Sequence, residues 1–197
     1  MATSTTLKRG FKAKAERIAT EYREKLGIHP CAPLCAFALA KFLDIKVHDA
    51  THFLSGLDDV NRLSGLDGSD CGWSALTMKD KDGKRLIIHN PFHTPARQQS
   101  NIMHEIAHIL CEHKKKPLPE GVNLPFGMRD FDKEQEDEAI YLGATLQLSR
   151  PCLLWARKTK MTNAEIANYY NASAEMVNFR IASTGVNKQY FPQKQRF

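Results

Sequence analysis

The sequence lacks any long apolar run. A helix that crosses a bilayer needs about 20 consecutive, mainly apolar residues. The longest candidate, Cys31 to Leu43, is shorter and contains Lys41. The amino terminus also lacks the apolar segment of a secretory signal, and its Arg and Lys residues are interspersed with Glu residues. We therefore expect a cytoplasmic protein that makes no contact with a membrane.

Cysteine is scarce and follows no pairing pattern. The five Cys residues form an odd, scattered set without a CxxC motif, which indicates reduced thiols rather than a disulfide framework. The chain of 197 residues is 42% hydrophobic and 25% charged. This composition excludes disordered, collagen-like and coiled-coil proteins, and the length is sufficient to bury a core without disulfides.

Negative charge is concentrated in one short segment. Residues 130–138 contain six acidic residues and one Lys, so the remainder of a chain with net charge +6 carries +11. A basic remainder favours solubility, and it is also compatible with weak affinity for nucleic acid or for an acidic partner. Charge alone does not decide between these interpretations.

Hydrophobic spacing and capping signals predict a mostly helical chain with a small β-sheet. Helices are expected over residues 8–26, 31–42, 95–112, 132–148, 151–157, 162–170 and 173–182. Strands are expected over residues 44–47, 73–78 and 85–89. The Asp82-Gly83 pair predicts an antiparallel hairpin from the last two. Residues 48–70 and 115–130 are expected to be irregular, and the tail from Asn187 to be loose.

One motif carries chemistry. Residues 104–108 read HEIAH, an HExxH pattern within a predicted helix. Side chains four residues apart lie on one helix face, so His104 and His108 can both bind one Zn²⁺. Glu105 lies beside the metal in such a site, where it can act as a general base toward water.

A zinc peptidase needs a third protein ligand and an open fourth position. The metzincin position, six residues after the second His, holds Lys114. His113 comes five residues after His108, and on a continued helix it would point away from the ligand face. Cys111 shares that face but lies about 10 Å from His104 along the axis, so we expect it to be a small core residue.

A carboxylate from the acidic helix is the remaining option. Residues two apart on a helix diverge by about 200°, so only one of Glu134, Glu136 and Glu138 can face a given metal. Glu136 lies over Ile140 and Gly143, part of a stripe that suits close packing on the motif helix. This pattern favours Glu136 only slightly over Glu138.

Two segments that contain the HExxH motif and the acidic helix are RLIIHNPFHTPARQQSNIMHEIAHILCEH and EQEDEAIYLGATLQLSRPCLL. They resemble the ImmA/IrrE family of metallopeptidases, and the resemblance extends over most of the chain. Its more specific marks are the lead-in of Asn90, Thr94 and Arg97 and the acidic E-x-E-A helix. Two positions depart from the family pattern: Ile140 replaces an Asn or Asp, and Ser149 replaces a Pro.

The resemblance implies an α+β fold with a mostly helical, zincin-like core, a small antiparallel sheet and a bound Zn²⁺. In the family the first Glu of the acidic helix is the third ligand, which gives His104, His108 and Glu136 here, with Glu105 catalytic. Family members are cytoplasmic, and several cleave helix-turn-helix repressors. The resemblance therefore implies a zinc endopeptidase whose protein substrate is a transcriptional repressor, without giving the cleavage site or the oligomeric state.

The C-terminal helices have a signal of their own. Residues 162–182 have small, turn, cap and core residues at the spacing of a helix-turn-helix. We therefore divide the chain into a metallopeptidase domain, residues 1–158, and a helix-turn-helix-like extension, residues 159–197. Asn178 and Arg180 would face DNA if the pair bound it. Packing on the core, or docking of the substrate, is the favoured interpretation.

Two classes of function are compatible with these features. The first is the zinc endopeptidase. The second is a non-catalytic, antitoxin-like regulator that keeps the metal for structure and could contact DNA. A purely structural metal site does not need an acid at Glu105, so this residue favours the enzyme.

Overall fold

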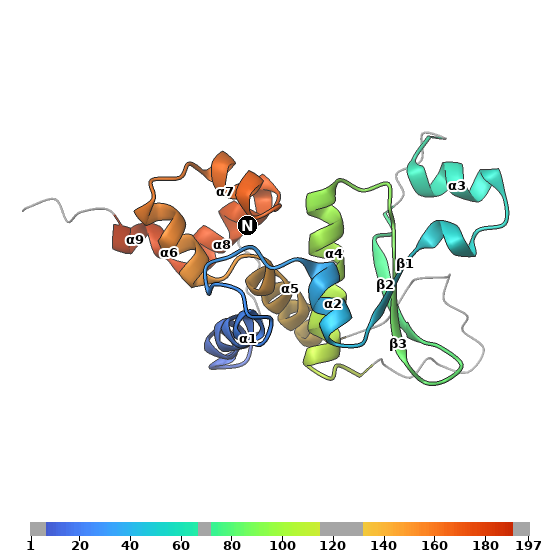
Figure 1. Cartoon of the computed structure of the whole chain (residues 1–197), viewed down its shortest axis with the longest axis horizontal. Helices are drawn as coiled ribbons and strands as arrows, with labels where there is room; N and C mark the ends of the chain where they lie inside the picture. Colours follow the sequence, from blue (N-terminus) through green and yellow to red (C-terminus); the bar gives the residue numbers. More distant parts are fainter. Residues whose placement is uncertain (1–6, 67–71, 115–131, 191–197) are drawn as a thin grey trace, which may run out of the picture.

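A computed structural model describes residues 7–66, 72–114 and 132–190. Its helices are α1 (Phe11–Lys25), α2 (Ala36–Phe42), α3 (Leu57–Ser64), α4 (Pro95–Leu110), α5 (Lys133–Gln147), α6 (Arg150–Lys158), α7 (Asn163–Tyr169), α8 (Ala174–Thr184) and α9 (Val186–Tyr190). Its strands are β1 (Lys46–Asp49), β2 (Ala75–Lys79) and β3 (Arg85–His89). The sheet and the C-terminal helices lie at opposite ends of the molecule, with α4 and α5 between them (Figure 1).

The fold is α+β, as predicted, but its sheet is mixed rather than antiparallel. The strand order is β1-β3-β2, with β2 antiparallel and β1 parallel to β3. The chain leaves β1 through a 3₁₀ turn, α3 and β2 before it enters β3. This long connection returns the chain to the starting end of β1, so the two strands run in the same direction.

Strand β2 lies at an edge of this sheet, since among the described strands it pairs with β3 alone. The Asn90 amide donates to the Ser74 carbonyl at 2.9 Å. The Asp80 amide donates to the Lys84 carbonyl at 2.8 Å. These bonds fix the alternation of the ladder, in which every second residue bonds to the partner strand. Three residues of β2 therefore direct their backbone N–H and C=O groups away from β3: Ala75, Thr77 and Lys79.

The hydrophobic core has three clusters. The first joins α1, α2, α4 and α5 and includes Ile87 from one face of β3. The second lies on the other face of the sheet, where Leu76 and Ile88 pack with Leu63 of α3. The third gathers the C-terminal helices around Leu153. It starts at residue 148, within the predicted peptidase domain, and the division at residue 158 stays a prediction.

Three segments differ from the sequence-based expectation. Helix α2 begins at Ala36 rather than at residue 31, because the Gln99 side chain of α4 accepts the Ala36 amide at 2.6 Å and sets its start. Helix α3 lies in the segment expected to be irregular. It ends at Gly65 with φ of 74°, so this glycine ends a helix rather than marking a loop. Helix α9 lies where the tail was expected to be loose.

The predicted irregular segment 115–130 lies outside the described residues. The longest described helix, α4, has 16 residues, fewer than the roughly 20 needed to cross a bilayer. Within the described part of the chain, no helix is long and apolar enough to span a membrane.

Candidate metal centre

Helix α4 carries the HExxH motif, and its start is fixed by its own sequence. The Thr94 hydroxyl accepts the Arg97 amide, and Pro95 occupies the first turn, which are a typical N-cap and N1 residue. The helix is regular from Pro95 to Leu110. His104 and His108 consequently share one face, which is turned toward α5.

The structure brings together the three predicted metal ligands. The Nε2 atoms of His104 and His108 are 3.1 Å apart. The two carboxylate oxygens of Glu136 lie 3.4 Å from these nitrogens, one from each. Ligands held at 2.0–2.1 Å in a tetrahedral zinc site are about 3.3 Å from one another. The nitrogen–nitrogen separation is close to one edge of such a site, and each carboxylate oxygen of Glu136 lies at a similar distance from one of the two nitrogens, so the three side chains are placed to bind one Zn²⁺.

The other two Glu residues of α5 have different partners. Glu134 pairs with Lys8 at 2.5 Å, and Glu138 lies 3.1 Å from His113. Hydrogen bonds with His104, and then with His108, lower the pKa of Glu136 well below its ordinary value. Glu136 is therefore held as a carboxylate, the form that binds a metal.

Close packing of α5 on α4 places Glu136 within reach. A Cβ added at Gly143 would lie 3.0 Å from the backbone nitrogen of His104, so only glycine permits this approach. Gly143, which makes this contact, belongs to the stripe of Glu136, Ile140 and Gly143 that the sequence predicted on one face of α5. Ile140 itself is exposed.

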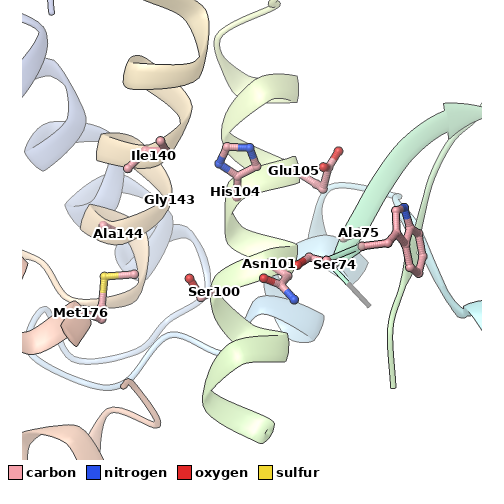
Figure 2. A pocket seen from close by; sticks show the side chains of 12 residues that line it. Ser74, Ala75, Ser100, Asn101, His104, Glu105, Ile140, Gly143, Ala144 and Met176 are labelled. Atoms are coloured by element: carbon pink, nitrogen blue, oxygen red, sulfur yellow. The ribbon is translucent and has the colours of Figure 1, made fainter. Parts of the chain in front are cut away.

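Glu105 points to the sheet side of α4, on the other side of the helix from His104 (Figure 2). It is 7% exposed. Its Oε2 atom accepts a hydrogen bond of 2.6 Å from the Thr77 hydroxyl on β2. This bond holds the carboxylate in a fixed orientation beside the cavity. Thr77 gave no signal in the sequence, because only the tertiary position of β2 brings it near α4.

A cavity of about 440 Å³ lies beside α4, where His104 and Glu105 both reach its wall. Helix α5 bounds it on one side and the start of β2 on the other (Figure 2). His104 and Glu105 form part of its wall, together with Ala75 of β2 and Met176 of α8. The cavity therefore connects the candidate metal centre with the edge strand.

The continued helix that was assumed for His113 is absent, although His113 lies outside the group of His104, His108 and Glu136. Helix α4 ends at Leu110, and Glu112 has a left-handed φ of 54°. The chain therefore turns back, and the Nδ1 atom of His113 lies 2.9 Å from Nδ1 of His108. Burial, the larger effect, lowers the pKa of His113 despite its contact with Glu138. A helix-based projection missed this contact because the helix stops before residue 113.

Cys111 is half-buried and packs against the main core cluster, as expected. Burial raises its pKa to about 11. Its sulfur, a ring nitrogen of His113 and a carboxylate oxygen of Glu138 lie within 4.8 Å of one another. This second group of possible metal ligands lies next to the first.

Helices α7 and α8 contain a single basic residue, Arg180, and it does not take the DNA-facing position that the less favoured interpretation gave it. Its side chain is fully buried. It donates to the Leu148 carbonyl at 2.8 Å and pairs with Glu16 of α1 at 2.5 Å. Asn178 is exposed. Helices α7 and α8 thus present no cationic side chain of their own to a phosphate backbone.

Comparison with known proteins supports the interpretation of the motif. The family model of Peptidase_M78, described as the IrrE N-terminal-like domain, matches residues 69–182. The match runs from the segment before β2 into α8, and it includes α4 and α5. No curated protein gives a significant match. Since the matched residues make up more than half of the sequence, the chain belongs to the Peptidase_M78, or ImmA/IrrE, family of metallopeptidases.

Proposed function

We propose that this chain is a zinc-dependent endopeptidase that cleaves a helix-turn-helix transcriptional repressor at a specific site. The observation that carries the proposal is the set of three contacts among His104, His108 and Glu136, with separations of 3.1, 3.4 and 3.4 Å. The separation of the two nitrogens is close to the roughly 3.3 Å edge of a tetrahedral zinc site, and each oxygen of the one carboxylate lies near one of these nitrogens.

When bound there, Zn²⁺ supplies Lewis acidity, which acidifies a water molecule and polarises the scissile carbonyl. Glu105 takes the proton of the attacking water on its carboxylate and then passes it to the leaving amine. Thr77 supports both steps, because its hydroxyl bond to Oε2 holds the carboxylate in place. The low exposure of Glu105 limits competition from bulk water.

Strand β2 offers a binding edge for an extended peptide. Ala75 lines the cavity, and the ladder directs its backbone groups away from β3. A substrate strand that pairs with this edge gains backbone hydrogen bonds and a fixed register. The scissile bond of such a strand would pass over α4 near His104 and Glu105, which both line the cavity.

The choice of a repressor as the substrate rests on the resemblance to family members that cleave such proteins. The C-terminal helices support a role in substrate docking rather than in DNA binding. Met176 of α8 lines the cavity, whereas the one basic residue of α7 and α8 is buried.

The test is incubation with candidate helix-turn-helix repressors, with and without a chelator. We expect cleavage by the zinc-loaded protein, none after chelation, and recovery on addition of Zn²⁺. Glu105→Gln should retain zinc and fold while cleavage slows by about 10² to 10⁴, because an amide cannot accept the water proton. Glu112→Gln, an exposed change in the same segment, is the matched control. Cleavage by Glu105→Gln at the wild-type rate would exclude this mechanism.

Metal analysis tests the ligand assignment separately. The zinc affinity of Glu136→Ala should fall by more than the roughly 100-fold that loss of an indirect contact costs, because this variant lacks a direct ligand. Glu138→Ala should still bind one zinc. Undiminished zinc in Glu136→Ala, with loss in Glu138→Ala, would contradict the assignment. A wild-type protein that binds zinc but cleaves nothing would favour the non-catalytic regulator.

A further inference from the structure

A chain of two contacts extends from His108 into the protein, on the side away from the proposed metal. His113 Nδ1 lies 2.9 Å from His108 Nδ1. His113 Nε2 lies 3.1 Å from Glu138 Oε2. The side chains of His108, His113 and Glu138 are only 5%, 4% and 10% exposed, so water does not readily substitute for either contact. Neither His113 nor Glu138 has a part in the proposed reaction.

The proton positions in this chain follow from the chemistry of imidazole. A neutral imidazole carries one N–H and one acceptor nitrogen. If Nε2 of His108 binds the metal, its proton is on Nδ1, and this N–H must donate to Nδ1 of His113. The single proton of His113 is then on Nε2, where it donates to the carboxylate of Glu138. Each donor in this arrangement meets an acceptor.

The local fold builds this chain of contacts. The left-handed Glu112 turns the backbone after α4, and the His113 amide donates to the His108 carbonyl at 3.1 Å. The Lys114 amide donates to the Gln135 side chain at 2.8 Å, which ties the turn to α5. Glu136 and Glu138 approach His108 from its two nitrogens, the first directly and the second through His113.

We propose that His113 and Glu138 are positioning residues that fix the ring orientation and the Nδ1–H tautomer of His108, so that its Nε2 lone pair faces the metal. This proposal rests on the proposed function, in which His108 is a ligand. Partners of this kind behind a ligating His commonly contribute 10- to 100-fold in metal affinity.

The side chains of His113 and Glu138 could instead bind a second metal together with Cys111. The proton positions argue against this alternative. A metal on Nε2 of His113 would move the His113 proton to Nδ1, which faces Nδ1 of His108. His108 would then have to accept there and carry its own proton on Nε2, which prevents it from binding the first metal. The two sites therefore exclude each other.

The experiment measures Zn²⁺ affinity and stoichiometry by competition with a chelating dye. We expect one zinc per chain in every variant and weakening by 10- to 100-fold in both His113→Ala and Glu138→Ala. The double variant should be no weaker than His113→Ala alone, since Glu138 acts only through His113. Glu138→Gln should retain most of the affinity because its amide oxygen still accepts. Glu134→Ala, on the same helix but paired with Lys8, should match the wild type.

A second measurement needs no substitution. Long-range ¹H–¹⁵N correlation of the zinc-loaded wild type should give Nδ1–H for His108 and Nε2–H for His113, a signature that general packing would not impose. The opposite tautomer of His113, wild-type affinity in His113→Ala, or additive losses in the double variant would overturn the proposal. A second zinc that is lost in Cys111→Ser would also overturn it. A wild type that binds no zinc contradicts the metal centre itself, whereas the preceding outcomes contradict only the positioning role.

Discussion

Gly143 packs directly against the backbone of His104. A Cβ at Gly143 would lie 3.0 Å from the His104 nitrogen and 3.1 Å from its Cα. Both are backbone atoms within a helix, so a rotamer change cannot relieve the overlap. The absence of a side chain at Gly143 therefore sets the separation of α4 and α5. Gly143 lies two turns from Glu136 on α5, so it also sets the distance from Glu136 to the two histidines.

Gly143→Ala should consequently weaken both the fold and the metal centre. The added methyl group must push the helices apart, and overpacking of this kind costs about 1–3 kcal/mol. The same shift should move Glu136 away from His104 and His108 and lower zinc affinity. Urea unfolding of the zinc-free protein and zinc titration measure the two effects. Gly72→Ala, where a Cβ meets nothing within 4 Å, is the control, and equal stability and affinity in both variants would contradict the argument.

The grouping of the three candidate metal ligands could be predicted from local spacing. His104, His108 and Glu136 lie on two long helices whose caps and periods are encoded within the helices themselves, and Gly143 falls on the face of Glu136. Spacing on an ideal helix is reliable where the helix continues. It therefore predicted which side chains come together but could not choose firmly between Glu136 and Glu138 without the resemblance to a family.

The features that were missed depend on where an element ends or on how the chain returns. His113 meets His108 because α4 stops at Leu110 and Glu112 turns left-handed. Thr77 meets Glu105 because β2 takes the edge beside α4. The parallel direction of β1 follows from a long connection. None of these has a local periodic signal, so the sequence could not predict them.

Cys111 should behave as a buried thiol and not as a metal-binding thiolate. Burial penalises the thiolate, so the pKa rises to about 11, and roughly one thiol in a thousand is ionised at pH 8. Its alkylation by iodoacetamide should keep rising about tenfold per pH unit between pH 8 and 10, where an ordinary thiol with a pKa near 8.5 levels off. Peptide mass spectrometry measures the rate, with Cys111→Ser to identify the peptide. A plateau by pH 9 would show that the thiolate is stabilised.

Arg180 should matter for stability and not for DNA binding. Its fully buried guanidinium joins Glu16 of α1 to α8, and loss of one partner of a buried pair costs about 3 kcal/mol. Arg180→Met keeps the length but removes the charge, so urea unfolding should show a loss of this size. Lys188→Met, an exposed change on α9, should be close to neutral. A gel-shift assay that detects specific DNA binding lost in Arg180→Met, with unchanged stability, would contradict this assignment.

The edge of β2 gives the most direct test of how the substrate binds. Proline has no N–H to donate, and it is tolerated at edge positions whose N–H points outward. Ala75 has such an N–H and lines the cavity. Ala75→Pro should therefore keep the pairing of β2 with β3 and the zinc affinity. It should remove a hydrogen bond to the substrate, worth about 0.5–1.5 kcal/mol, and lower kcat/KM by about 2- to 12-fold.

Two further proline variants make this test specific. Lys79→Pro changes an outward-facing residue at the far end of β2, away from the residues that line the cavity, and should cleave nearly normally. Leu76→Pro removes an amide that the ladder directs toward β3, so it should lower the free energy of unfolding before it affects catalysis. Thermal unfolding, zinc titration and the rate of repressor cleavage are compared across the three proteins. If Ala75→Pro folds, binds zinc and cleaves at the wild-type rate, the substrate does not pair with this edge.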